Sequence, residues 1–344
     1  PREQAGRNIH YDDASLSNYK KVEQGDFIIH LRSFEGGLEM ANEAGIVSPA
    51  YTILRCKRPH SSLFYDAYFH TDEFINHNLS KSVEGIRDGR QISYEAFKWL
   101  GIPYCEPTEQ EKISNLFAAL NEKIAKQRDL IEALKKYKRG VVRTLLSPKH
   151  CSIKNVKWTT SRIGDIGTFI KGAPLSKADI SLEGTPFILY GELYTTYSEV
   201  ISNVVRKTQA SVDKQYYSQI GDVIIPTSGE TPEEISTASC VMLPDIILAG
   251  DLNIYRCTQV DGRIMSYILN HVVNDRIARI AQGKSIVHVQ AAEISKIEIT
   301  YPDPFSQKTI IAILAAISDR IDQSNAELRL LYELRKALLQ KLFI

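Results

Sequence analysis

A tandem repeat is the feature that most constrains the fold of this chain. Four short patterns occur twice in the same order, at offsets of 194 to 201 residues. Each copy has a Gly-Asp turn before an apolar strand pattern, a second strand pattern, a Gly-basic-polar-Ile turn and a long apolar helix. The matched segments are 25–29 with 221–225, 51–56 with 252–257, 89–92 with 283–286, and 113–146 with 310–343.

The two long helices carry apolar residues at a strict alternation of three and four positions. This 3.5-residue period predicts a coiled coil, and the polar interruptions fall at the same place in both copies. Two amphipathic helices in unrelated cores are the alternative. The predicted seam is Phe117, Leu120, Ile124, Gln127, Ile131, Leu134, Lys138, Val141 and Leu145, matched by Leu314, Ile317, Ile321, Ser324, Leu328, Leu331, Arg335, Leu338 and Leu342.

The repeat predicts an α+β fold with pseudo-twofold symmetry. Two globular domains are expected, separated by two long antiparallel helices that form a coiled coil, each about 50 Å long at 1.5 Å per residue. The first copy has only 24 residues before Gly25, so we expect about fifty residues of its module to be missing. The expected segments are 1–106 for domain 1, 107–147 for the central helix, 148–304 for domain 2 and 305–344 for the C-terminal helix.

Composition excludes several classes of protein. There are 42 Lys and Arg residues against 41 Asp and Glu residues, so any binding of nucleic acid requires local basic surface or a partner. Five scattered cysteines favour neither a disulfide framework nor a zinc site. The apolar runs are too short to cross a bilayer, so we expect a cytoplasmic protein without a membrane partner.

Known catalytic motifs are incomplete or missing in this sequence. Gly283-Lys284-Ser285 ends like a phosphate-binding loop, but Ala278 stands where the first glycine is required. His70 and His77 have no metal-binding spacing, and a solvated helix face is the simpler interpretation. There is no GxSxG elbow and no tetrapeptide typical of adenine methyltransferases. We therefore expect no catalytic or metal site, with covalent chemistry left to another subunit.

The best candidates for DNA contacts are basic and polar residues in turns. The repeated turns and the loops after the Gly-Asp strands lie at equivalent places in the two copies, and the loops differ, as two readers of unlike half-sites would require. The alternative for each turn is a solvated surface residue. The candidates are Arg32, Ser33, Arg90, Gln91, Lys171, Lys177, Thr227, Ser228, Lys284 and Ser285.

The order of module, long helix, module and long helix is typical of one family. Segments 107–113 and 135–140, the latter just before Leu145 and Leu146, fit that arrangement, and residues 163–167 after Trp158 look like the opening of a target recognition domain. On these features the chain resembles the specificity (S) subunits of type I restriction-modification systems, over essentially its whole length.

This resemblance implies a subunit that reads an asymmetric, bipartite site in double-stranded DNA. Each recognition domain would read one half-site, and the coiled coil would set the spacer. Two methyltransferase subunits using S-adenosylmethionine and restriction subunits using ATP and Mg would dock on this chain, which itself would bind no cofactor. The rivals are a lone endonuclease or methyltransferase, and a non-catalytic coiled-coil adaptor or stand-alone DNA-binding protein.

Overall fold

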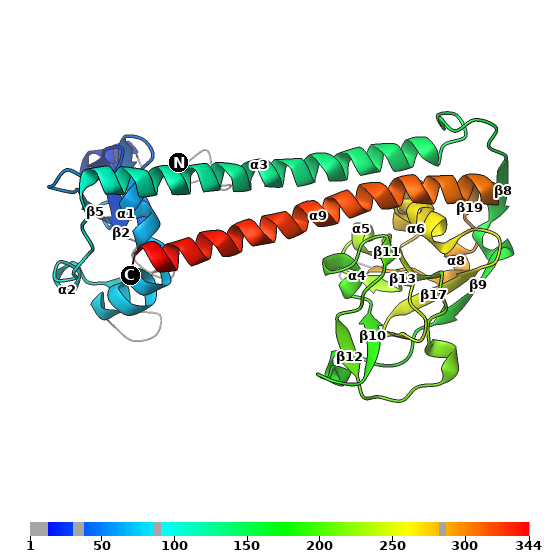
Figure 1. Ribbon diagram of the computed structural model, residues 1–344. Helices are drawn as coiled ribbons and strands as arrows, with labels where there is room; N and C mark the ends of the chain where they lie inside the picture. Colours follow the sequence, from blue (N-terminus) through cyan, green and yellow to red (C-terminus); the bar gives the residue numbers. More distant parts are fainter. Residues whose placement is uncertain (1–12, 30–37, 85–90, 282–286, 344) are drawn as a thin grey trace. The chain divides into compact units, whose positions relative to one another are not determined.

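The computed structural model describes residues 13–29, 38–84, 91–281 and 287–343. The chain divides into two compact units: unit 1 consists of Pro1–Ile131 and Ser324–Ile344, and unit 2 of Glu132–Gln323. Each unit combines helices with strands, so the predicted α+β class is confirmed (Figure 1). The boundaries fall inside the two long helices, because each helix adds side chains to the cores of both units.

Unit 1 is built from short strands and helices that precede the first long helix. Its elements are η2 (Asp13–Asn18), β1 (Lys20–Val22), β2 (Phe27–Ile29), β3 (Glu39–Met40), β4 (Gly45–Val47), β5 (Thr52–Leu54), α1 (Ser62–Phe69), η3 (Glu73–Asn78), η4 (Leu79–Ser82), β6 (Val83–Glu84), β7 (Gln91–Ile92), α2 (Tyr94–Phe97) and α3 (Pro107–Leu145), which continues into unit 2.

Unit 2 begins after α3 and continues into the second long helix. Its strands are β8 (Trp158–Arg162), β9 (Gly167–Lys171), β10 (Thr185–Leu189), β11 (Val200–Ile201), β12 (Arg206–Thr208), β13 (Asp222–Pro226), β14 (Ser228–Gly229), β15 (Ser239–Val241), β16 (Ile247–Ala249), β17 (Leu252–Cys257), β18 (Val287–His288) and β19 (Glu298–Pro302). Its helices are η6 (Ile163–Asp165), η7 (Lys177–Asp179), α4 (Glu192–Thr195), η8 (Lys214–Tyr216), α5 (Pro232–Ile235), α6 (Gly262–His271), α7 (Asn274–Ile280), α8 (Ala291–Ile294) and α9 (Pro304–Leu342).

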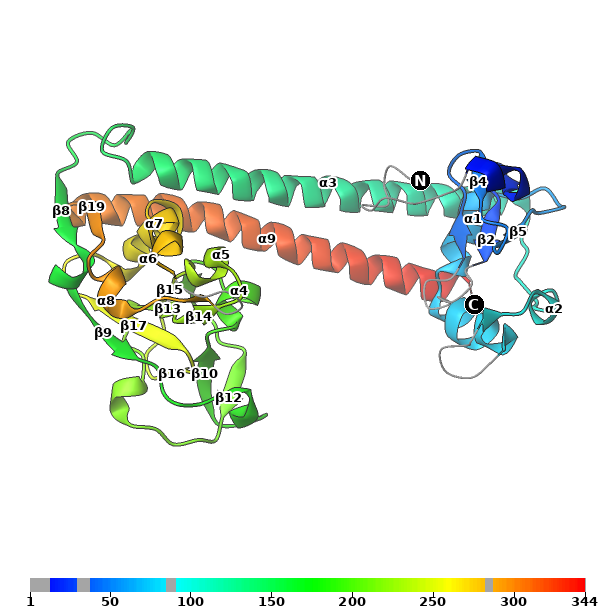
Figure 2. The ribbon, with the colours of Figure 1, turned by 180° about the vertical axis from the view of Figure 1, so that it is seen from behind.

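The predicted repeat appears as two sheets with the same strand order. In unit 1 the order is β3-β2-β5, and in unit 2 the matching strands run β15-β13-β17. All of these pairs are antiparallel, and the registers agree: Phe27 lies opposite Leu54, as Val223 lies opposite Tyr255. Unit 2 adds β9 beside β17 and β11 beside β15, and a separate pair of strands, β8 and β19, lies side by side (Figure 2).

The Gly-Asp turns at the start of the central strands are built in the same way in both units. Gly25 and Gly221 have φ values of +91° and +94°, a left-handed conformation that glycine adopts without strain. The following aspartates receive a guanidinium from the neighbouring strand: Arg55 Nε lies 2.8 Å from Asp26 Oδ1, and Arg256 Nε lies 3.1 Å from Asp222 Oδ1. The hydrogen bond from Arg55 lowers the pKa of Asp26, which keeps this carboxylate charged.

Each unit has an apolar core between its sheet and a helix, and in unit 2 a second apolar core lies on the other face of the sheet. In unit 1, α1 buries Phe64, Tyr68 and Phe69 against Phe117 of α3 and Phe343 near the end of α9. In unit 2, α6 is buried against the sheet together with residues from the end of α3 and the start of α9, including Leu145, Leu146, Ile310 and Leu314. The N-caps of α1 and α6 are also equivalent, since Ser61 and Asp261 each accept a hydrogen bond from a main-chain N–H of the first turn.

The long helices begin six residues before the matched apolar segments of the repeat, at or next to the starts expected at 107 and 305. The matched apolar segments start at Ile113 and Ile310, whereas α3 starts at Pro107 and α9 at Pro304. A proline is well tolerated at the first helical position, because its missing N–H would have no partner there. Helix α3 ends at Leu145, before Pro148, as expected for a residue that cannot continue the hydrogen-bond ladder.

Most residues of the predicted seam are shielded from solvent. The exception is Leu342, which is 39% exposed, while the next residue, Phe343, is buried in unit 1. The buried seam residues are Phe117, Leu120, Ile124, Gln127, Ile131, Lys138, Leu145, Leu314, Ile321, Ser324 and Leu331, and the half-buried ones are Leu134, Val141, Ile317, Leu328, Arg335 and Leu338.

Contacts within unit 1 show that α3 and α9 run antiparallel there. Leu120 and Ile124 pack with Leu331, and Arg335 donates to Asn121 Oδ1 at 3.0 Å, whereas Gln127, later in α3, contacts Ser324, earlier in α9. Gln127 Nε2 donates to the carbonyl oxygen of Ser324 at 3.0 Å, so the two matched polar interruptions are in direct contact. The same amide nitrogen also donates to Glu327 Oε2 at 3.3 Å, and a buried amide with partners on one stretch of the facing helix favours a single register, because slippage would leave it unpaired.

Lys138, the other polar interruption of α3, makes a buried ion pair in unit 2. Its Nζ lies 2.7 Å from Glu199 Oε2, and His271 Nε2 of α6 lies 2.7 Å from Glu199 Oε1. Burial on its own would raise the pKa of Glu199, but the hydrogen bond from His271 and the charge of Lys138 outweigh it and lower the pKa to about 2. The carboxylate therefore joins α3, α6 and the strand edge before β11.

In the described part of the chain, no helix is long and apolar enough to cross a membrane. Among the same residues, no three His, Cys, Asp or Glu side chains are grouped so that they could hold a metal ion.

Candidate nucleic-acid interface

The turn at Gly250 and Asp251 joins two of the loops that the sequence marked as DNA contacts. Gly250 has φ +75° and donates its N–H to the carbonyl oxygen of Ala173 at 2.8 Å. On the other side, the N–H of Thr227 donates to the Asp251 carbonyl at 2.8 Å, and Ser228 Oγ donates to Asp251 Oδ2 at 3.0 Å. Segments that are more than fifty positions apart in sequence therefore meet at one corner of unit 2.

Two exposed lysines stand at this corner. Lys171 ends β9 opposite Asn253 of β17, and Lys177 begins η7, whose start is fixed by a reciprocal capping box between Ser176 and Asp179. Neither lysine has an ion pair within 4.0 Å among the described residues. Exposed ammonium groups on fixed backbone are suited to phosphate oxygens, which position a protein on DNA without reading its sequence.

A cleft of about 810 Å³ opens beside the same turn. It is lined by Lys177, Tyr190, Glu192, Thr195, Arg206 and Asp251, among others. Glu192 is buried and accepts from Arg206 Nε at 2.9 Å and from the N–H of Leu189 at 3.2 Å, so this carboxylate holds its neighbours in place. Asp251 is exposed and offers an acceptor of the kind that recognises a base amino group.

Four of the predicted residues thus come together, namely Lys171, Lys177, Thr227 and Ser228. Ser228 is only 5% exposed and its hydroxyl is engaged by Asp251, so it orients that carboxylate instead of facing a ligand. Tyr194 supports the same loop by donating from its hydroxyl to the Ser228 carbonyl at 2.7 Å. Burial raises the pKa of Tyr194, which keeps this hydroxyl protonated and able to donate.

The other predicted DNA contacts fall mostly outside the described residues. This applies to Arg32, Ser33, Arg90, Lys284 and Ser285, whereas Gln91 lies in the two-residue strand β7. Strand β18 follows Ser285 by two positions and pairs with β14, where Ser228 lies opposite His288. The second repeated turn therefore leads directly into the strand beside the corner.

Three further basic residues and one acid were missed by the sequence reasoning. Arg206 and Asp251 line the cleft in unit 2, and both come from segments without a motif. In unit 1, β1 carries the exposed Lys20 and Lys21, and Lys20 Nζ donates to the Tyr51 carbonyl at 2.7 Å. Tyr51 precedes β5 as Asp251 precedes β17, so the matching corner of unit 1 is basic as well. In the sequence, the adjacent residues Lys20 and Lys21 were the signal of this basic corner.

Comparisons with known proteins identify the family of this chain. A family model described as the type I restriction modification DNA specificity domain matches residues 155–331, just over half of the chain. No curated protein matches the sequence.

Two solved structures have a similar fold at 16% sequence identity. One is a chain from work on complex assembly and conformational transition of the type I R-M system; the TM-score is 0.63, and the match covers 94% of this chain and 83% of that one. The other is the S subunit of a type I restriction-modification system from M. genitalium, with a TM-score of 0.59 and coverage of 99% and 86%. The family predicted from the repeat is confirmed: this chain belongs to the type I restriction modification DNA specificity domain family.

Proposed function

We propose that this chain is the specificity subunit of a type I restriction-modification complex and that units 1 and 2 each read one half of a bipartite, asymmetric DNA site. The observation that carries the proposal is the duplicated sheet, whose matching corners present different side chains. Lys20 and Tyr51 stand at one corner and Lys177, Arg206 and Asp251 at the other. Two units with the same sheet but different contact residues suit a DNA site whose two halves differ in sequence.

Within unit 2, the lysines are proposed to contact phosphates and the cleft to contact base edges. Replacing Lys171 or Lys177 by Ala is expected to weaken DNA binding for all sequences and to reduce the salt slope of log K by about 0.9 for each phosphate that the protein no longer neutralises. The measurement is a titration of DNA with the assembled complex at several salt concentrations. Lys308→Ala, an exposed lysine on α9, is the matched control. An unchanged salt slope in both lysine variants would place the DNA elsewhere.

The long helices are proposed to set the unspecified spacer between the half-sites. They are continuous over 39 residues each, and the Gln127 contact with Ser324 favours one register. A rigid connection is required if both half-sites are to be read at a fixed separation, because a flexible linker would accept a range of spacers.

One flank of the helix pair is proposed to dock the partner subunits. Residues directly before the seam positions remain exposed there: Leu116 by 45%, Leu334 by 49%, Tyr137 by 60% and Ile313 by 37%. Lys123 and Glu327, which occupy the same heptad position, form an ion pair at 3.6 Å and show that this flank is shared by both helices. Large exposed apolar side chains that recur in this way mark an interaction surface.

The exposed apolar residues form two sets, one in each unit. Because the helices are antiparallel, seven positions before Lys123 in α3 correspond to seven positions after Glu327 in α9. These positions are Leu116 and Leu334, which define docking face 1 in unit 1. Fourteen positions after Lys123 and fourteen before Glu327 lie Tyr137 and Ile313, which define docking face 2 in unit 2. The small exposed residues Ala119 and Ala337 border face 1, and Gly140 and Ala316 border face 2, which allows a partner helix to approach closely.

The opposite flank of the helix pair is buried against the core of each unit. Val142 and Leu339, four positions after the seam residues Lys138 and Arg335, are buried in the cores of units 2 and 1. Because Leu116 matches Ile313 and Tyr137 matches Leu334 in the repeat, the two docking faces are equivalent. They are therefore proposed to bind two copies of the same partner, the methyltransferase subunit, while restriction subunits complete the complex.

Disabling one docking face is expected to remove one partner. With Tyr137→Asp and Ile313→Asp together, the complex should carry one methyltransferase subunit in place of two, because charges at a desolvated helix contact are strongly unfavourable. Native mass spectrometry of the assembled complex measures the stoichiometry. Asp129→Lys, an exposed charge change on α3, is the control. Retention of both partners by the double variant, with its fold intact, would rule out this flank.

This chain is proposed to bind no cofactor itself; S-adenosylmethionine, ATP and Mg would act in the partner subunits. The purified chain should then leave DNA uncut and unmethylated, whereas addition of the methyltransferase subunit should produce methylated adenine. Cleavage or methylation by the chain alone would support the rival of an independent enzyme.

A further inference from the structure

Asp251 lies in the turn before β17 and lines the cleft of unit 2. Its backbone is held on two sides, because its carbonyl oxygen accepts from the N–H of Thr227 and the preceding residue, Gly250, donates to Ala173, both at 2.8 Å. Its side chain is held as well, since Ser228 Oγ donates to Oδ2 at 3.0 Å. The carboxylate is therefore exposed to solvent and at the same time fixed in position.

One oxygen of this carboxylate remains available. Among the described residues, Oδ1 has no hydrogen-bond partner, and no Lys, Arg or His nitrogen lies within 4.0 Å of Asp251. Arg206 of the same cleft pairs instead with the buried Glu192, at 2.9 Å. The cleft thus presents a charged acceptor that no neighbouring cation neutralises, beside lysines that are suited to phosphates.

An unpaired carboxylate on a surface that binds DNA is unfavourable unless it meets a hydrogen-bond donor, because it repels the phosphates that the lysines attract. In the major groove, the donors on the bases are the amino groups of cytosine and adenine. Adenine carries the N7 acceptor beside its amino group, whereas cytosine presents its amino group without an acceptor on the same base edge. A side chain that can only accept therefore favours cytosine and disfavours the other three bases.

The repeat shows that this carboxylate is not needed to build the sheet. The position matched to Asp251 is Ala50, whose side chain cannot accept a hydrogen bond. Both residues precede the strand that pairs with the central strand of their sheet, β5 in unit 1 and β17 in unit 2. The sheet of unit 1 forms without the acid, so an effect of Asp251 on base preference is expected in one half-site only.

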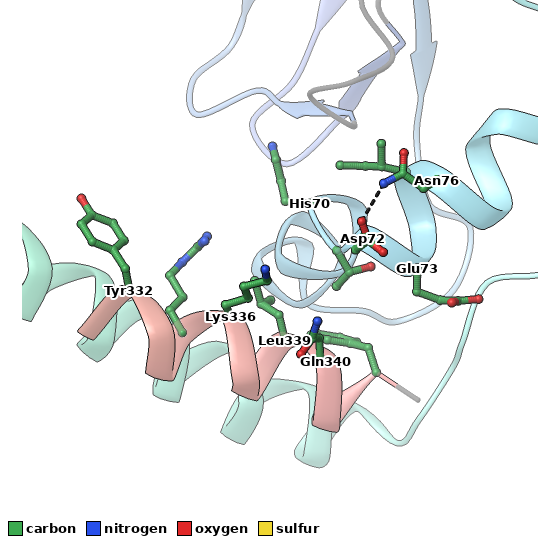
Figure 3. A pocket seen from close by; sticks show the side chains of 12 residues that line it. His70, Asp72, Glu73, Asn76, Tyr332, Lys336, Leu339 and Gln340 are labelled. Carbon is green, nitrogen blue, oxygen red and sulfur yellow. Dashed lines mark hydrogen bonds between the residues drawn. The ribbon is translucent and has the colours of Figure 1, made fainter. Parts of the chain in front are cut away.

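The large cavity of unit 1 is not a counterpart of the cleft. It has a volume of about 890 Å³ and lies between α9 and residues 70–76, with Lys336 on the helix side and Asp72 opposite (Figure 3). Both oxygens of Asp72 have partners, since Asn76 Nδ2 donates to Oδ1 at 2.6 Å and His77 Nε2 lies 4.0 Å from Oδ2. None of its lining residues belongs to the sheet β3-β2-β5 or to the turn before β5, so no base contact is assigned to it.

We propose, on the basis of the function proposed above, that Asp251 selects a cytosine in the half-site read by unit 2. Its Oδ1 accepts a hydrogen bond from the amino group of that base in the major groove. Ser228 is a positioning residue, because its hydroxyl holds Oδ2 and thereby orients the carboxylate. Guanine and thymine present acceptors to the same oxygen, and adenine presents N7, so the contact contributes mainly to specificity.

The base preference of variants at Asp251 tests this assignment. Complexes of the methyltransferase subunit with the Asp251→Asn or Asp251→Ala chain are compared with the wild-type complex by mapping methylated adenines and scoring every position of both half-sites. We expect the preference for cytosine to fall by about tenfold or more at one position of one half-site, with the other positions unchanged. Ser228→Ala should lower the preference at the same position and should have no further effect in the Asp251→Ala chain.

Two controls separate a base contact from a general loss of binding. Lys177→Ala changes another side chain of the same cleft and should weaken methylation at all sites without changing the preferred bases. DNA with N4-methylcytosine in place of the selected cytosine keeps the Watson–Crick pair but lacks the amino hydrogen that faces the major groove. The wild-type complex should bind it about tenfold or more weakly than unmodified DNA, whereas the Asp251→Ala complex should bind both equally.

The outcomes distinguish this assignment from the proposed function. If the wild-type complex selects a split motif and both Asp251 variants select the same bases, the role of Asp251 is overturned while reading by two units stands. The role is also overturned if the affected base pair is not C·G, or if N4-methylcytosine acts equally on the wild-type and Asp251→Ala complexes. A wild-type complex without a split motif would contradict the proposed function and, with it, this inference.

Discussion

Removing one heptad from each long helix is expected to shorten the preferred DNA spacer by about three base pairs. Seven helical residues span about 10 Å, and base pairs are spaced by about 3.4 Å. The deletion removes residues 124–130 from α3 and 321–327 from α9. These stretches face each other, since Gln127 contacts Ser324, so the antiparallel register on both sides is retained. Methylation at the original spacing should fall at least a hundredfold.

The two half-site sequences serve as the internal control for this experiment. They should be unchanged, because the deletion removes no residue from either sheet or from the corners beside β5 and β17. The readout is the consensus of methylated sites made by the variant complex. If the shortened protein still selects the original spacer, the helices do not measure the distance between half-sites.

Separating Lys138 from Glu199 is expected to destabilise unit 2 strongly. The side chains are only 10% and 15% exposed, and Lys138→Met leaves Glu199 buried without the charge of Lys138, with the hydrogen bond from His271 retained. Breaking a buried pair in this way costs about 3 to 5 kcal/mol of unfolding free energy. Urea unfolding measures the loss, and Lys135→Met is the control, because Lys135 pairs with Glu132 on the exposed side of α3.

The double variant Lys138→Met with Glu199→Gln provides a second test of the same pair. It should recover part of the lost stability, since no unpaired charge remains.

The contribution of Glu199 to the free energy of unfolding depends on pH with a defined sign. The pKa of Glu199 is about 2 in the folded chain and near 4.5 ordinarily, so its contribution is present above about pH 4.5 and is lost as the pH falls toward 2. A wild-type stability curve with the same acid limb as Glu199→Gln would contradict this assignment.

The parts of the fold that depend on periodic patterns were predictable from the sequence. Spacings of three and four residues located Phe117, Leu120 and Ile124 on one helix face, because burial on a helix follows its period. Prolines also indicated the starts of the long helices, which were expected at 107 and 305 and lie at Pro107 and Pro304, because proline is favoured at the first helical position. Leu342 was assigned to the seam by period alone, but Phe343 takes the buried place at the end of α9.

The candidate DNA interface was predictable only in pieces. Lys171, Lys177 and Thr227 were chosen one by one, and their convergence depends on the turn at Gly250 and Asp251, which no local pattern links to them. Arg206 and Asp251 were missed because the cleft joins segments far apart in the chain. The role of Ser228 was also hidden, since only the folded chain shows its hydroxyl bonded to Asp251.

The most direct test of the central claim is a genome-wide map of methylated adenine, made after co-expression of this chain with the methyltransferase subunit. Single-molecule sequencing would record the position and context of each modified base. Two units that each read one half-site predict a single asymmetric motif, split by a gap of fixed length. A complex that forms but methylates without sequence preference, or that selects an unsplit motif, would contradict the account.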